Sequence, residues 1–148
     1  VGRTNLQKGS LEQAEQDFKK ALMIYRAVAA ADPQNTLKKL QMVGNIALLA
    51  QTVGLNGRLA ESVELFENAL AMFAAEDAAG RLRNLDKKSY AVCYLDFAKV
   101  LIKNGGKAAA MNNLNRAEQI LSEEAVKKDA SAELETLKAL SMQAVALR

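Results

Sequence analysis

The chain has 148 residues, of which half are hydrophobic and a quarter are charged, and its formal net charge is +3. Basic and acidic residues are interleaved, so no strong electrostatic field for nucleic acid is implied, and a single cysteine excludes an internal disulfide. One proline and eight glycines leave long stretches of good helix formers, chiefly Ala and Leu. The composition predicts an all-α protein.

The first predicted helix lies between a capping residue and a proline. Ser10, followed three residues later by Gln13, suits a capping box at a helix start. Asp32–Pro33 closes this helix, because the residue before a proline disfavours the helical conformation.

The later helices are separated by glycine turns. Asn56–Gly57 and Asn104–Gly105–Gly106 suit helix ends at which a residue adopts the left-handed conformation. Asp129 or Ser131 can cap the last helix. The predicted helices are residues 10–31, 36–55, 58–78, 86–103, 107–127 and 132–147.

A shift of 48 residues reveals an internal repeat, because it brings together Gly9, Gly57 and Gly105. Three further columns keep a small or a large apolar residue in all three copies: Ala14, Ser62 and Ala110; Phe18, Phe66 and Leu114; Ala21, Ala69 and Ala117. Each period contains two amphipathic helices, and the small residues let helices approach closely. Such pairs cannot bury their apolar faces alone, so we expect them to stack.

These columns resemble the tetratricopeptide repeat (TPR) superfamily. The family's large–small pair, loop glycine and small–aromatic–small series correspond here to Leu49–Ala50, Gly57, Ser62, Phe66 and Ala69, and one period later to Phe97–Ala98, Gly105, Ala110, Leu114 and Ala117. The family's period is about 34 residues. The longer period here is similar to that of long-helix variants such as the repeats of kinesin light chains. The resemblance implies a right-handed superhelical solenoid of antiparallel helix pairs, with six to seven helices.

The repeat register divides a single TPR-like domain, residues 1–148, into four parts. Residues 1–35 form a partial repeat, residues 36–83 and 84–130 are two repeats, and residues 131–148 are an unpaired or capping helix. Because the chain opens with Val1 instead of Met, we expect a processed chain or a fragment of a larger protein.

TPR-like arrays bind peptides or helices of partner proteins in the concave face lined by their first helices, so the resemblance implies an interaction scaffold. The register places three columns there: Arg3, Gln51 and Lys99; Ala47, Leu95 and Gln143; Gln7, Leu55 and Lys103. The resulting groove is mildly basic and partly apolar, which suits an acidic and apolar partner. The competing interpretation is that its charges are ordinary solvated residues.

Catalysis is not expected. The chain has no histidine for acid–base work, so no such base is present to activate Cys93, which we expect to be a packed thiol. Gly105–Gly106 lacks the Lys and Ser/Thr of a phosphate loop. We expect no cofactor, no metal, no membrane span and a reducing compartment such as the cytoplasm.

Three alternative functions remain open. RNA binding rests on the basic run of Arg81, Arg83, Lys87 and Lys88. Self-association rests on the apolar face of the last helix, formed by Leu134, Leu137, Leu140 and Met142. A regulatory domain of a larger signalling protein is the third.

Overall fold

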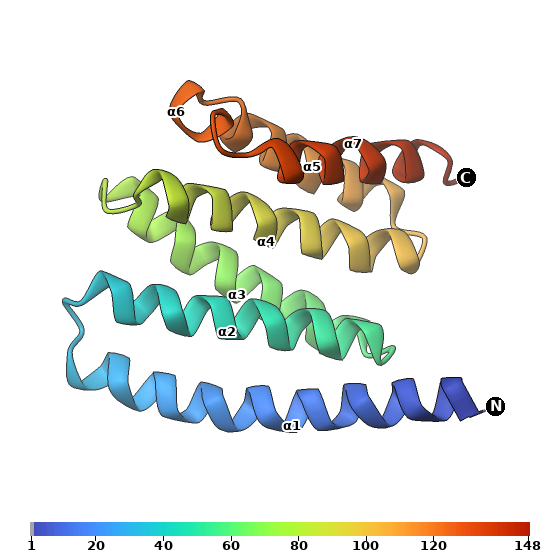
Figure 1. Ribbon diagram of the computed structural model, residues 1–148, viewed down its shortest axis with the longest axis horizontal. Coiled ribbons are helices and arrows are strands. Elements are labelled where there is room, and N and C mark those ends of the chain that lie inside the picture. The colour runs from blue at the N-terminus through green and yellow to red at the C-terminus, as the bar shows by residue number, and fades with distance from the viewer. Residues whose placement is uncertain (1) are drawn as a thin grey trace. The chain divides into compact units, whose positions relative to one another are not determined.

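The computed structural model describes residues 2–148, with side chains from residue 9 onward, and in this part of the chain it contains seven helices and no strand (Figure 1). The helices are α1 (Gly2–Ala31), α2 (Thr36–Leu55), α3 (Leu59–Ala78), α4 (Asn84–Lys103), α5 (Lys107–Leu121), α6 (Glu124–Lys127) and α7 (Ser131–Val145). The chain forms two compact units, an N-terminal unit (residues 1–72) and a C-terminal unit (residues 73–148), and the division falls within α3.

The prediction of an all-α protein is confirmed, but the predicted start of the first helix at Ser10 is wrong. Helix α1 runs through Gly9 and Ser10 without a break. Gly57 and Gly105 have φ angles of 89° and 76° and end their helices, whereas Gly9 is not among the glycines with positive φ. A lone glycine lowers helix propensity without stopping a helix, and good helix formers flank Gly9 on both sides. Glycine therefore recurs at this position of the repeat, but its backbone conformation differs between the first copy and the other two.

The predicted helix 107–127 is also corrected, because it breaks after Leu121. The Ser122 hydroxyl donates to the carbonyl of Glu118 at 2.7 Å, and Glu123 is extended, with φ −61° and ψ 128°. A serine that bonds to its own backbone competes with the helix. The break lets Val126, which is 2% exposed, enter the core from α6.

Neither Asp129 nor Ser131 caps the last helix as predicted. Its N-cap residue is Ala130, which makes no side-chain cap and is fully buried. Helix α7 therefore begins where the chain packs into the core. The carbonyl of Asp129 instead accepts a hydrogen bond from Lys88 Nζ at 3.3 Å.

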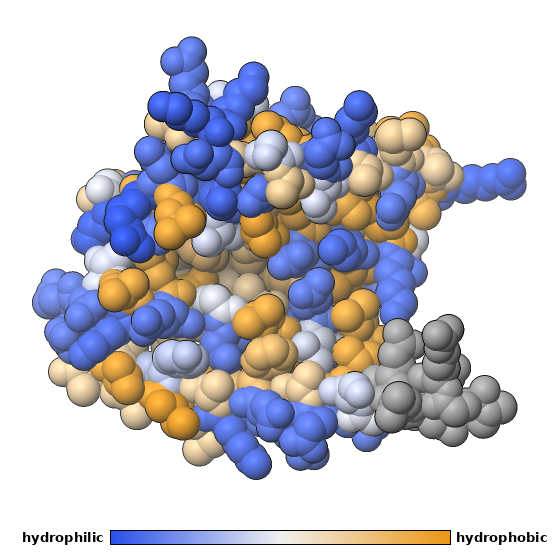
Figure 2. Space-filling view, in the orientation of Figure 1, coloured by the Kyte–Doolittle hydropathy of each residue, from blue (hydrophilic) through white to orange (hydrophobic). Residues whose placement is uncertain are grey.

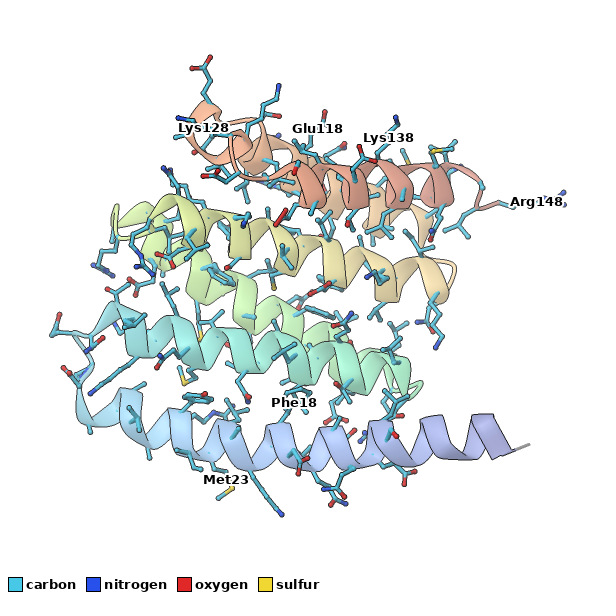
Figure 3. The ribbon with its side chains drawn as sticks, viewed as in Figure 1. Phe18, Met23, Glu118, Lys128, Lys138 and Arg148 are labelled. Carbon is cyan, nitrogen blue, oxygen red and sulfur yellow. The ribbon has the colours of Figure 1, made fainter. Side chains whose placement is uncertain are left out.

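In the N-terminal unit, α1 and α2 lie side by side and are joined by polar contacts as well as apolar ones. Phe18 points from α1 toward α2, while Met23 points away from it and is 73% exposed (Figure 3). Buried Asn45 donates from Nδ2 to the carbonyl of Phe18 at 2.8 Å. The hydroxyl of Ser62 on α3 donates to the carbonyl of Ala50 on α2 at 2.6 Å. A small residue is needed at position 62 because the α2 backbone approaches it this closely.

Opposite effects are expected for alanine substitutions within the glycine column. Gly57→Ala forces a side chain into the left-handed region and should reduce the free energy of unfolding by about 1–2 kcal/mol. Gly9→Ala should increase it by about 0.5–1 kcal/mol, because the residue is helical and a Cβ there meets no atom within 4 Å. Urea unfolding followed by circular dichroism measures both. Equal losses in the two variants would mean that Gly9 is a turn.

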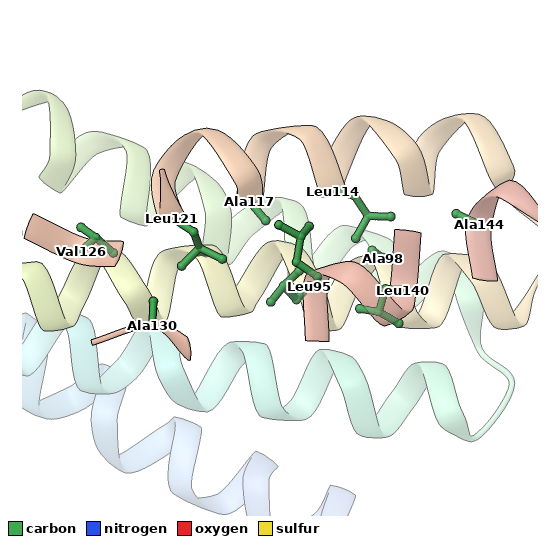
Figure 4. Packing of buried hydrophobic residues seen from close by; sticks show 11 residues of the cluster. Leu95, Ala98, Leu114, Ala117, Leu121, Val126, Ala130, Leu140 and Ala144 are labelled. Atoms are coloured by element: carbon green, nitrogen blue, oxygen red, sulfur yellow. The ribbon is translucent and has the colours of Figure 1, made fainter. Parts of the chain in front are cut away.

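The C-terminal unit is built on one apolar core between α4, α5, α6 and α7 (Figure 4). Its central residues are buried and come from each of these helices: Ala91, Leu95, Ala98, Leu114, Ala117, Leu121, Val126, Ala130, Leu137, Leu140 and Ala144. Two lysines fix α7 at its ends. Lys88 on α4 pairs with Glu133 at 3.5 Å, and Lys107 Nζ on α5 donates to the carbonyl of Leu147 at 3.1 Å. These contacts set α7 against both α4 and α5.

Candidate protein-binding groove

A groove of about 610 Å³ lies in the C-terminal unit between α5 and α7. We call it the α5–α7 groove, and its lining residues are Glu118, Leu134, Leu137, Lys138, Ser141, Met142 and Val145. Met142 is 69% exposed and Val145 is 62% exposed, so the groove presents large apolar side chains to solvent. Along the upper rim of Figure 2, where α5 and α7 lie, hydrophobic side chains reach the surface between hydrophilic ones.

One acidic and one basic side chain flank this apolar surface. Glu118 on α5 and Lys138 on α7 project to the same side of the unit (Figure 3). The third polar residue, Ser141, donates its hydroxyl proton to the carbonyl of Leu137 at 2.8 Å within α7. The donor of Ser141 is therefore used inside the helix, and the groove has an apolar floor with one charge of each sign at its edge. This arrangement suits an amphipathic ligand better than a small polar one.

Two of the four residues on the predicted apolar face of the last helix are buried in the core. Leu137 and Leu140 are 9% and 3% exposed and belong to the core, whereas Leu134 is partly buried and Met142 is exposed, and both line the groove. The contributions of Glu118, Lys138 and Val145 were not anticipated. The three-and-four spacing of residues 134, 137, 141 and 145 was the available signal for a helix face at this site.

The prediction that Leu95 lines the concave face is wrong. It is 2% exposed and lies in the core, because α7 packs on α4 and brings Leu137 and Leu140 into the same cluster. A side chain in that position is unavailable to a partner.

The other concave-face residues lie on surfaces or outside the described side chains. In the N-terminal unit, Ala47, Gln51 and Leu55 are half-buried on α2. In the C-terminal unit, Lys99 and Lys103 on α4 and Gln143 on α7 are exposed. The side chains of Arg3 and Gln7 lie outside the described residues. The concave groove itself stays a prediction.

The basic run considered for RNA binding is neutralised by carboxylates of the same unit. Arg81 pairs with Glu76, Arg83 with Asp86, Lys87 with Glu123 and Lys88 with Glu133. The hydrogen bonds from the Arg83 side chain lower the pKa of Asp86, although its burial acts in the opposite direction. Each cation that would contact a phosphate thus has an acidic neighbour, which weakens the case for nucleic acid.

Cys93 is buried, with 2% of its surface exposed. Burial, with a smaller contribution from the charge of Asp96, raises the pKa of its thiol from 9.0 to about 12. A thiol with a raised pKa is a poor nucleophile at neutral pH. Cys93 is therefore a packing residue in this structure.

The raised pKa predicts a loss of stability in alkali. Above pH 9 the unfolded chain releases the Cys93 proton while the folded chain keeps it until about pH 12. The free energy of unfolding should therefore fall with rising pH, by up to about 1.4 kcal/mol per pH unit from this group. Urea unfolding between pH 8 and pH 11 measures the slope, and a Cys93→Ala variant should show a shallower one. Equal slopes would show that the thiol has the same pKa in the folded and the unfolded chain.

The described residues offer neither a metal site nor a membrane-spanning helix. They contain no cluster of three or more His, Cys, Asp or Glu residues able to hold a metal ion. None of the helices formed by residues 2–148 is long and apolar enough to cross a membrane. No family model, curated protein or solved structure matches the chain significantly.

Proposed function

We propose that this chain is a non-catalytic protein-interaction module that binds a helix or peptide of a partner protein. The observation that carries the proposal is the α5–α7 groove, in which Met142 and Val145 are largely exposed beside Leu134. Contiguous exposed apolar side chains with a polar rim are typical of protein-binding surfaces. The architecture we propose for the module is a TPR-like right-handed solenoid of antiparallel helix pairs, supported by the 48-residue repeat.

A second surface is a candidate for the same function. Lys99 on α4 and Gln143 on α7 are exposed, and both belong to the predicted concave face. An acidic partner would favour this surface, whereas an apolar helix would favour the α5–α7 groove. Substitutions on the two surfaces therefore separate the two modes of binding.

The test is affinity capture from an extract of the source cells with four forms of the chain: native, Met142→Glu, Lys99→Glu and Met23→Glu. We expect a partner that the native, Lys99→Glu and Met23→Glu chains retain and the Met142→Glu chain loses, because a carboxylate buried against the partner is left unpaired. Met23 is a matched control, since it is also an exposed methionine on a helix. Circular dichroism confirms that each variant is folded.

Loss of the partner with Lys99→Glu alone would move binding to the predicted concave face. Capture of no specific partner by the native chain would contradict the proposed function.

A further inference from the structure

A cavity in the N-terminal unit lies where three helices meet. Its volume is about 410 Å³, and its walls come from α1, α2 and α3. Five of its lining residues are Ala29 on α1, Met42 and Ile46 on α2, and Asn68 and Met72 on α3. The third helix, α3, forms one of its walls.

The same cavity recurs in the C-terminal unit, 48 residues later. Its volume is about 230 Å³, and it lies between α3, α4 and α5. The five corresponding residues all line it: Asp77 on α3, Tyr90 and Tyr94 on α4, and Arg116 and Ile120 on α5. Five matches at one offset show that the 48-residue repeat extends to these junctions, each of which is lined by three successive helices. We call the last of the three the covering helix.

The α5–α7 groove occupies the third position in this series. The residues 48 positions after Tyr90 and Tyr94 are Lys138 and Met142, and both line the groove. Tyr90 is 8% exposed and Tyr94 is half-buried in the second cavity, whereas Lys138 is exposed and Met142 is 69% exposed. The α7 side of the groove thus matches the series, whereas Glu118 of α5, its other side, has no counterpart in the two cavities. Among the residues that line the groove, none comes from a third helix.

We infer that the α5–α7 groove binds an amphipathic helix of a partner protein, seated as α5 is seated in the preceding junction. This inference rests on the proposed function and names the chemistry of its ligand. The two helices that cover junctions in this chain share a small, a large apolar and a small residue at positions 1, 5 and 8 of the packed face. In α3 these are Ser62, Phe66 and Ala69, and in α5 they are Ala110, Leu114 and Ala117; all six are buried.

The series also specifies a charge on the ligand. In the second junction the residue of the covering helix at position 7 is Arg116, which lines the same cavity as Tyr90. The counterpart of Tyr90 in the open groove is Lys138, which is a cation. An acidic residue at position 7 of the bound helix would therefore lie near Lys138 and pair with it. The ligand is a small–large–small amphipathic helix with Asp or Glu at position 7.

Two synthetic peptides test this inference on the whole chain: an acetylated peptide with the sequence of residues 107–121, and the same peptide with Arg116→Glu. Each is titrated into labelled protein, and the Met142 methyl and Val145 amide resonances are followed by NMR. We expect saturable shifts at both residues. We expect the Arg116→Glu peptide to bind about two- to fivefold more tightly, the range of one exposed ion pair.

Variants of the protein complete the test. Lys138→Glu should reverse the order of the two peptides, and Met142→Glu should weaken both by at least about tenfold, because a carboxylate would be buried unpaired. Met23→Glu should leave both affinities unchanged. An unchanged order of the peptides with Lys138→Glu would remove the charge assignment.

The remaining outcomes separate this inference from the proposed function. Peptide shifts confined to Lys99 and Gln143, or no shifts while the Met142-dependent partner is still captured, would overturn the inference and leave the function standing. A dimer in sedimentation experiments that Met142→Glu dissociates and the peptides do not compete would make a second copy of this chain the occupant, and would also overturn it.

Discussion

Phe66→Ala is expected to lower the free energy of unfolding by about 3–5 kcal/mol, the largest effect of any single substitution considered. Phe66 on α3 is fully buried, as is its neighbour Ser62, whose hydroxyl donates to the α2 backbone. Truncation removes a whole ring from the interior and leaves a void, since the backbones of α2 and α3 are held together by that hydrogen bond. Urea denaturation followed by circular dichroism measures the loss.

The repeat itself supplies the control for this prediction. Phe18 occupies the same column 48 residues earlier, but it is only half-buried between α1 and α2. Phe18→Ala should therefore cost about half as much as Phe66→Ala. Equal losses would indicate that local sequence, and not the depth of burial, decides the contribution of this column.

The second large effect is expected in the C-terminal unit, where Leu121→Ala should cost about 2–5 kcal/mol. Leu121 is the last residue of α5 and is fully buried in the core. It shares that core with Val126 and Ala130, which follow the helix break, so its side chain holds the α6 segment against α4 and α5. Urea unfolding gives the energy, and hydrogen exchange should show reduced protection from residue 124 onward.

Leu85→Ala is the matched control, because Leu85 is a leucine of the same unit that is 60% exposed. It should change the free energy of unfolding by no more than about 0.5 kcal/mol. A Leu121→Ala variant as stable as Leu85→Ala would contradict the packing of the α6 segment described above.

Local chemistry was sufficient to predict most of the helices. Apolar residues at three-and-four spacing, Asp32–Pro33 and the glycines at 57 and 105 act over a few residues, and the observed helix ends agree with them. Comparison of the sequence with itself also needed no structure, and it established the 48-residue register. The two junction cavities repeat that register in space. The same local rules failed at Gly9, where a turn residue lies in a continuing helix, because nothing in the packing requires the chain to turn there.

The tertiary structure alone decided which apolar surface is buried. The sequence placed Leu95 on a binding face and Leu137, Leu140 and Met142 together on an uncovered one. Packing of α7 against α4 and α5 instead buries Leu95, Leu137 and Leu140 and leaves Met142 beside Val145 in the α5–α7 groove. Helical periodicity fixes which residues share a face, but the burial of that face depends on neighbours that are distant in sequence. Tyr90 and Lys138 occupy the same position in the repeat, yet Tyr90 is buried in a cavity lined by three helices and Lys138 is exposed in a groove lined by two.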